Sequence, residues 1–346
     1  METSLDVTSS DATRARTTKP VGAALGQDLA RPHPQPPHGL ARIVRLALRV
    51  VPPILLVAAI WVLWREFHKL SFAAVSAAVA GWGLTAILLT LVLSVTSFLL
   101  MGAIEWVGLR WTGAKVPVGP TLMGSFLANG IAHAIGANLL TSGAIRARFY
   151  ERFGVSLTQA AGATLFAALS FGVGISALSG VGLLLASNAD LARTAIPLVA
   201  GRSLGGALLA VALGYVVLCA LRRKPVTGFG RSLTLPTARD AMAQLVLGVV
   251  DNGIAAAILW ILLPTGGPSY VTFVGAYAVA CITGLISSVP GGAGVFESAM
   301  AALLPGVAPA ELAAAFLGYR LVYYILPLIL AALTLAVETL RNRRES

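Results

Sequence analysis

The chain has 346 residues, of which 57% are hydrophobic and only 11% are charged, with a mean hydropathy of +0.83. Soluble domains carry roughly 25% charged residues, so this composition excludes an ordinary soluble protein and indicates a polytopic membrane protein. The formal net charge is +11, but the basic residues flank apolar stretches as the positive-inside rule requires, so we expect no nucleic-acid partner. Cys219 and Cys281 lie in apolar runs and the four histidines lack ligand spacing, so we expect no metal and no cofactor.

The N-terminal part divides into a polar tail and a first apolar span. Residues 1–40 are rich in threonine and then in proline, and they lack an apolar run, so we expect a disordered cytoplasmic tail. A basic run before the apolar stretch at about 46–64 places the N-terminus in the cytoplasm. Residues 65–82 are typical of an interfacial amphipathic helix. We expect the membrane domain to cover 41–340, followed by a short cytoplasmic tail at 341–346.

Seven further apolar segments follow the first span. They cover about 84–107, 118–140, 158–186, 202–221, 240–263, 270–289 and 310–337. If each segment crosses the membrane, the bundle has eight full spans. That count places the arginines at 146–152 and the basic run at 222–239 outside, against the positive-inside rule.

A second arrangement resolves this charge problem. The segment 118–140 enters from the cytoplasm, breaks near Gly136 and Asn138 and returns, while 270–304 re-enters from the outer face and breaks at 290–294. We therefore favour an all-α polytopic helix bundle with six full spans and two opposed re-entrant hairpins, with eight full spans as the alternative. Opposed broken segments are typical of inverted-repeat transporters. Residues 142–146 also resemble residues 293–297 faintly when the two stretches are aligned, which favours the same opposed arrangement.

Candidate binding residues gather after the first break. Asn138 and Thr141 offer neutral hydrogen-bonding groups, and Arg146 and Arg148 offer guanidinium groups suited to a lipid phosphate. The alternative is that these arginines are only a positive-inside anchor, and for Arg146 an ion pair is equally open. Glu105 lies near the cytoplasmic end of its span, and we expect it to snorkel to the interface.

The second break interrupts a strongly apolar region with glycines, a proline and a carboxylate. Non-helical backbone at membrane depth survives only where protein or a water-filled cavity satisfies it, so such a break is a site hypothesis. Glu297 either caps the helix that follows or pairs with a cation, which is Arg146, Arg320 or a positively charged group of the substrate. The candidate binding residues here are Ser288, Pro290, Gly291, Gly292, Gly294 and Glu297.

Two more charged residues lie inside predicted spans. Asp251 is a proton site, a cation site or a counter-charge to Arg320; the alternative is a helix–helix hydrogen bond through Asn252 with Asp251 merely paired. We expect Arg320 to contact Glu297, Asp251 or a lipid phosphate. His133 lies one turn from Asn129 on the first hairpin, and there a packing hydrogen bond is favoured over a proton relay.

Two motifs carry a family resemblance. They are Ser-x-Val-Pro-Gly-Gly-x-Gly-x-Phe-Glu at 287–297 and Gly-x-Asn-x-Leu-Thr-x-Gly-x-x-Arg-x-Arg-x-Tyr at 136–150. Over about 42–340 the chain resembles the lysylphosphatidylglycerol synthase/flippase transmembrane family, in its freestanding branch. The resemblance implies a bacterial inner-membrane protein that moves, or helps move, lipids between leaflets. The basic residues at both ends predict that both termini are cytoplasmic. The aminoacyl-transferase domain of the family's two-domain members does not follow the membrane part, so we expect no enzymatic activity.

The leading functional hypothesis is a lipid translocase that moves a phospholipid or a lipid-linked headgroup between leaflets. The alternative is a membrane enzyme or accessory protein for lipid-linked sugar or envelope-lipid synthesis. The implied partner is a membrane phospholipid or lipid-linked substrate. A homo-oligomer or a separate synthase as a further partner stays open.

Overall fold

The computed structural model describes the chain from residue 80 onward, with a few gaps. The described residues are 80–135, 138–222, 226–228, 231–233, 235–263, 266–286 and 294–344. All of them belong to one compact unit, residues 50–346. Several predictions fall outside this part of the chain: the tail at 1–40, the span at 46–64, the interfacial helix up to residue 79, the side chain of Asn138, and Ser288, Pro290, Gly291 and Gly292.

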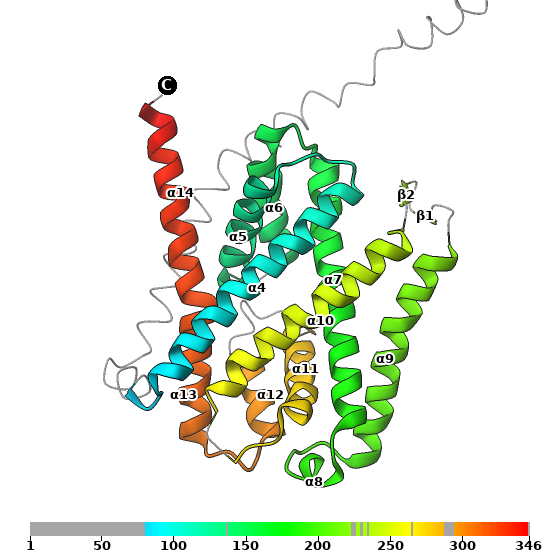
Figure 1. The fold of residues 1–346 in the computed structure, drawn as a ribbon, viewed down its shortest axis with the longest axis vertical. Coiled ribbons are helices and arrows are strands. Elements are labelled where there is room, and N and C mark those ends of the chain that lie inside the picture. Colours follow the sequence, from blue (N-terminus) through cyan, green and yellow to red (C-terminus); the bar gives the residue numbers. More distant parts are fainter. Residues whose placement is uncertain are drawn as a thin grey trace, which may run out of the picture. The chain divides into compact units, whose positions relative to one another are not determined.

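The described chain is helical, with one small hairpin (Figure 1). In order, the elements are α4 (Leu84–Trp111), α5 (Val118–Ile135), α6 (Asn138–Tyr150), the 3₁₀ turn η1 (Glu151–Phe153), α7 (Leu157–Leu185), α8 (Asn188–Leu191), α9 (Leu198–Leu221), β1 (Val226–Gly228), β2 (Arg231–Leu233), α10 (Ala238–Ile261), α11 (Tyr270–Ile286), α12 (Val295–Leu303), α13 (Pro309–Arg320), the π-helical turn η3 (Leu321–Ile325) and α14 (Leu326–Arg344). β1 and β2 pair antiparallel between α9 and α10. The predicted helical membrane architecture is confirmed.

Five helices in the described chain are long and apolar enough to cross a membrane. They are α4, α7, α9, α10 and the continuous stretch Pro309–Val337, and the shortest of them has 24 residues. At about 1.5 Å per residue, 24 residues extend about 36 Å, which exceeds the roughly 30 Å hydrocarbon core of a bilayer. These helices coincide with the predicted spans at 84–107, 158–186, 202–221, 240–263 and 310–337.

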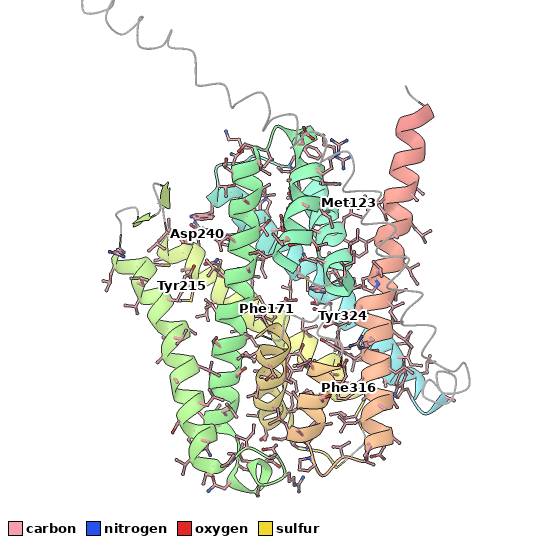
Figure 2. The ribbon with its side chains drawn as sticks, turned by 180° about the vertical axis from the view of Figure 1, so that it is seen from behind. Met123, Phe171, Tyr215, Asp240, Phe316 and Tyr324 are labelled. Carbon is pink, nitrogen blue, oxygen red and sulfur yellow. The ribbon has the colours of Figure 1, made fainter. Side chains whose placement is uncertain are left out.

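α7 lies at the centre of the packing, in contact with α4, α6, α9, α10 and α11. Its closest approach is to α10, where a Cβ added at Gly174 would lie 2.2 Å from the carbonyl carbon of Gly248. Glycine on both helices therefore allows the two backbones to touch, as is common between membrane helices. Phe171 lies midway along α7, one turn from this crossing (Figure 2), and its carbonyl accepts a 3.4 Å hydrogen bond from Asn252 Nδ2.

Two helix pairs pack beside opposite halves of α7 (Figure 1). α5 packs on α6, and a Cβ added at Gly143 of α6 would contact Thr164 in the N-terminal half of α7. α11 packs on α12, and Gly182 in the C-terminal half of α7 lies against the carbonyl of Val271 on α11. α6 has 13 residues and α12 has 9, so each is too short to span a bilayer by itself. Short helices thus flank both predicted break positions, whose central residues lie outside the described part of the chain.

The last long helix contains a π-helical turn with an identifiable cause. Pro327 has no N–H to donate to the carbonyl four residues earlier, and its ring clashes with that carbonyl in a regular α-helix. Here the N–H of Leu326 bonds instead to the carbonyl of Leu321, five residues back. This wider turn relieves the clash, and such turns are frequent at functional sites. α5 packs closely against it, because a Cβ at Gly130 would lie 3.3 Å from the Pro327 carbonyl oxygen.

Candidate functional site

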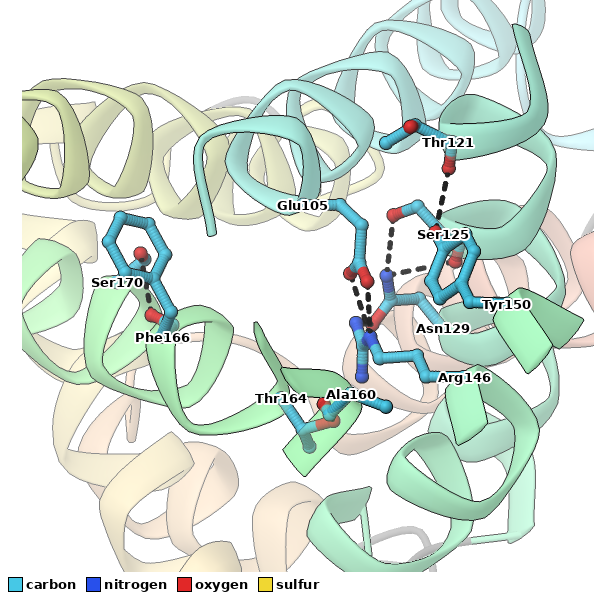
Figure 3. A network of polar contacts seen from close by, with 10 residues as sticks. All are labelled: Glu105, Thr121, Ser125, Asn129, Arg146, Tyr150, Ala160, Thr164, Phe166 and Ser170. Atoms are coloured by element: carbon cyan, nitrogen blue, oxygen red, sulfur yellow. Dashed lines mark hydrogen bonds and ion pairs between the residues drawn. The ribbon is translucent and has the colours of Figure 1, made fainter. Parts of the chain in front are cut away.

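A fully buried ion pair joins α4 to α6 (Figure 3). The Nε of Arg146 lies 2.9 Å and 2.7 Å from the two carboxylate oxygens of Glu105. The exposed fraction of the side chain is 2% for Arg146 and 0% for Glu105. Each charge would be costly alone in this surrounding, and the short contact between them offsets part of that cost.

Side chains of α5 hold this pair from the other side. One Nη group of Arg146 lies 3.5 Å from the Oδ1 of Asn129, which is a long contact. The amide nitrogen of Asn129 donates to the carbonyl and hydroxyl oxygens of Ser125 at 3.0 and 3.1 Å, which fixes the amide orientation. The hydroxyl of Tyr150 donates to the carbonyl of Thr121 at 3.1 Å and ties the end of α6 to the start of α5. The guanidinium position is therefore set by three helices.

The prediction that Glu105 snorkels to the interface is wrong. The position of Glu105 near the end of α4 suggested that its carboxylate reaches solvent. Instead, α6 places Arg146 against the carboxylate, and the side chain is fully buried. Of the two alternatives for Arg146, the ion pair is the one present. Arg148 is not brought to this site: its side chain is half exposed and pairs with Glu151 at 2.8 Å. Thr141 lies buried in the first turn of α6.

A second ion pair joins α12 to α13. The Oε1 of Glu297 accepts from the Nε and Nη2 of Arg320 at 2.7 and 2.5 Å. The Oε2 of the same carboxylate accepts from the backbone N–H of Gly294 at 2.7 Å. Glu297 therefore does both things that the sequence left open: it caps its own helix and pairs with a cation. Gly294 has φ +85°, a conformation that favours glycine, so the break ends in a fixed geometry.

Asp251 does not pair with Arg320. It is buried in the middle of α10 and accepts a 2.5 Å hydrogen bond from the hydroxyl of Ser97 on α4. Ser97 in turn lies 2.7 Å from the hydroxyl of Tyr323. Within the described ranges, no basic side chain forms an ion pair with Asp251. Asn252 makes the helix–helix hydrogen bond that was the alternative hypothesis.

Residues around η3 lie between the two helix pairs. The ring of His133, near the end of α5, lies 5.7 Å from Tyr323 and 6.0 Å from Tyr324, measured between centroids. On the other side, Tyr319 stacks on Phe296 of α12 at 6.3 Å and on Tyr323 at 5.5 Å. Figure 2 shows Tyr324 on the last helix beside the α5 end. One stretch, residues 319–324, thus contacts both pairs.

Ser97, Tyr319 and Tyr323 were not predicted from the sequence as members of this arrangement. Ser97 lies in a run of apolar and small residues, and its two partners are 154 and 226 residues away. Pro327 was the available signal for the widened turn that carries Tyr323. The packing hydrogen bond expected for His133 is not made by its Nδ1, which is buried and has no partner among the residues that the structure describes.

The family model for the lysylphosphatidylglycerol synthase TM region matches residues 46–331, most of the chain. The chain belongs to this family. The predicted resemblance is therefore confirmed, and with it a multi-pass membrane protein. The match covers both helix pairs and every charged residue of the candidate site.

Curated relatives of this family include freestanding proteins of similar length. The chain is 30% identical over 308 residues to the uncharacterized protein slr0712 of Synechocystis, covering 88% of this chain and 95% of that protein. It is 29% identical over 299 residues to the inner membrane protein YbhN of Escherichia coli, covering 83% and 91%. A shorter similarity, 33% over 72 residues, links it to the phosphatidylglycerol lysyltransferase of Staphylococcus epidermidis, covering 20% of this chain and 9% of that enzyme.

Proposed function

We propose that the protein is a lipid translocase of the bacterial cytoplasmic membrane. A phospholipid or lipid-linked headgroup would pass along the polar groups of the two helix pairs, while its acyl chains stay in the bilayer. One observation carries the proposal: each short helix pair supplies one charged member of an arginine–carboxylate pair inside an apolar bundle. Charged side chains at membrane depth are costly and mark substrate pathways.

The proposed mechanism is an exchange of anions on arginine. A guanidinium binds phosphate with the same forked geometry that it uses for carboxylate. In the structure, Glu105 and Glu297 contact the guanidinium groups of Arg146 and Arg320. A lipid phosphate that replaces a carboxylate keeps the arginine charge paired. The released carboxylate can then bind a positively charged group of the lipid headgroup.

The proposed topology follows from the placement of the two pairs. The α5–α6 pair re-enters from the cytoplasm and the α11–α12 pair from the outer face, with both termini cytoplasmic. The half-exposed Arg148 and the stacking of Arg110 on Trp106 support a membrane interface at that end of α4 and α6. Basic and aromatic residues are enriched at such interfaces on the cytoplasmic side. The α11–α12 pair lies at the opposite end of α7, as an opposed entry requires.

The proposal includes no chemical conversion of the lipid. The lysyl-transfer activity in the name of the staphylococcal relative belongs to a protein of which the similar region is only 9%. We therefore propose a phospholipid or lipid-linked molecule as a transported partner rather than as a reactant. A synthase that supplies this lipid would be a separate protein.

The test is translocation of fluorescent phospholipids in liposomes that contain the purified protein. We expect wild type to move labelled lipid between leaflets and the double variant Glu297→Gln, Arg320→Gln to be at least about tenfold slower, a barrier difference of about 1.4 kcal/mol. This pair is about one-fifth exposed, so the neutral double variant is expected to fold. Arg148→Gln serves as the matched control for loss of an arginine. Equal rates in wild type and in the double variant would rule out this site.

A further inference from the structure

Asp251 is a buried acid that the anion exchange does not use. It lies in the middle of α10 and is 7% exposed. The elements packed on α10 bring no free cation to it within the described chain, since α7 and α11 carry no charged residues. The charged groups on the other neighbours are Glu105 (paired with Arg146), Arg110 (on Trp106), Arg202 (bonded to carbonyls at the end of α7), Arg320 (paired with Glu297) and the exposed Glu311.

Two hydroxyl groups continue from Asp251 in a single hydrogen-bonded line. Oδ1 of Asp251 is 2.5 Å from Oγ of Ser97, which is 2.7 Å from the hydroxyl oxygen of Tyr323. Hydroxyls both donate and accept, so this line can exist in two orientations. With Asp251 ionised, Tyr323 donates to Ser97 and Ser97 donates to Asp251. With Asp251 protonated, both hydrogen bonds reverse.

Reversal of the line moves one proton with all atoms balanced. The proton on Oδ1 of Asp251 passes to Oγ of Ser97, and the proton of Ser97 passes to the hydroxyl oxygen of Tyr323. The original Tyr323 proton leaves to an acceptor on the far side. The neighbouring ring, His133, is 5.7 Å away between centroids, and its Nδ1 is the one buried side-chain polar atom of the described residues that has no partner. A neutral imidazole with its proton on Nε2 has an acceptor at Nδ1, although no hydrogen bond joins it to Tyr323 in the described structure.

The geometry fits a proton. Oδ1 of Asp251 and Oγ of Ser97 are in direct hydrogen-bond contact. Hydrogen bonds between a hydroxyl and a carboxylate are among the shorter ones in proteins. This chain of hydrogen bonds ends at Tyr323 in η3, one turn from Arg320. Tyr323 also stacks on Tyr319, so a change in the hydrogen bonding of Tyr323 affects the residues that contact both helix pairs.

We propose that Asp251 takes up and releases a proton through Ser97 and Tyr323, and that this exchange couples lipid movement to a proton gradient across the membrane. The coupling rests on the proposed translocase function. The proton exchange does not, because it is a property of the folded protein without any lipid cargo.

Infrared difference spectroscopy between acidic and alkaline buffer tests the exchange directly on the purified protein. We expect a carbonyl band of a buried, protonated carboxylic acid that disappears on deprotonation, is absent in Asp251→Asn and is shifted in Ser97→Ala. The variant Glu311→Gln, which removes an exposed acid, is expected to keep the band. Its persistence in Asp251→Asn, or its absence from wild type at every pH, would overturn the proposal.

Translocation in liposomes with an imposed pH gradient tests the coupling. We expect the wild-type rate to change by about tenfold or more when the gradient is collapsed, equivalent to about 1.4 kcal/mol, and the Asp251→Asn rate to be unaffected. A wild-type rate that ignores the gradient would refute coupling. If wild type shows the infrared band but moves no lipid under any gradient, the translocase proposal and the coupling fail, while the proton site stands.

Discussion

Removal of one charge from the Glu105–Arg146 pair is the sharpest test of the fold around the first helix pair. The substitution Arg146→Gln leaves the Glu105 carboxylate buried without its guanidinium. Both side chains are at most 2% exposed, so solvent cannot replace the lost partner. Breaking a buried pair in this way costs about 3–5 kcal/mol. Folded proteins are stable by only about 5–15 kcal/mol, so this loss is a large fraction of the total.

The assay is the thermal unfolding midpoint in one fixed detergent. At about 2–4 °C per kcal/mol, the Arg146→Gln variant is expected to unfold on the order of 10 °C earlier than wild type. The double variant Glu105→Gln, Arg146→Gln removes both charges, and we expect it to recover at least half of that shift. Arg148→Gln, at a half-exposed pair, is expected to change the stability by less than about 1 kcal/mol. If Arg146→Gln shifts the midpoint no more than Arg148→Gln does, the buried pair is not as described.

Three further substitutions test other parts of the account. Gly174→Ala forces α7 away from Gly248 and is expected to lower the stability by about 1–3 kcal/mol. The control Gly172→Ala, with open space around the added carbon, should be neutral or slightly stabilising. Equal thermal unfolding midpoints for the two variants would contradict the close crossing of α7 and α10. Gly294→Ala places a side chain at φ +85° and is expected to lower the stability by about 1–2 kcal/mol, measured by the same thermal unfolding midpoint. An unchanged midpoint would contradict a fixed backbone conformation at this residue. Pro327→Ala restores a helical N–H, so we expect a regular α-helix in place of η3 and slower lipid translocation, and unchanged transport would show that the π-helical turn is dispensable.

The spans could be predicted because apolar runs of this length have one stable solution in a bilayer. The helices α4, α7, α9 and α10 follow directly from such runs. Glu105 could not be predicted, because a carboxylate near a helix end looks interfacial until another helix covers it. The number of full spans stays a prediction, since α5–α6 and α11–α12 fit re-entrant pairs by length alone.

The contacts of the candidate site were likewise only partly predictable from the sequence. The Glu297–Arg320 contact was among the predicted pairings, because two opposite charges in apolar surroundings have few other partners. The Asp251–Ser97–Tyr323 line was not, since a serine and a tyrosine in apolar helices carry no local pattern that names their distant partners. Arg148 matched the same motif as Arg146, yet only two residues along the helix it faces a different environment.

The central claim is that an arginine of one of the two ion pairs exchanges its carboxylate for a lipid phosphate. The most direct measurement is solid-state NMR of the protein in phospholipid bilayers, with carbon-labelled arginine and detection of phosphorus-to-guanidinium dipolar coupling. We expect a close phosphate contact in wild type that is lost in Arg320→Gln and retained in Arg148→Gln. A spectrum in which Arg320→Gln leaves every arginine–phosphate contact unchanged would contradict the claim for that pair.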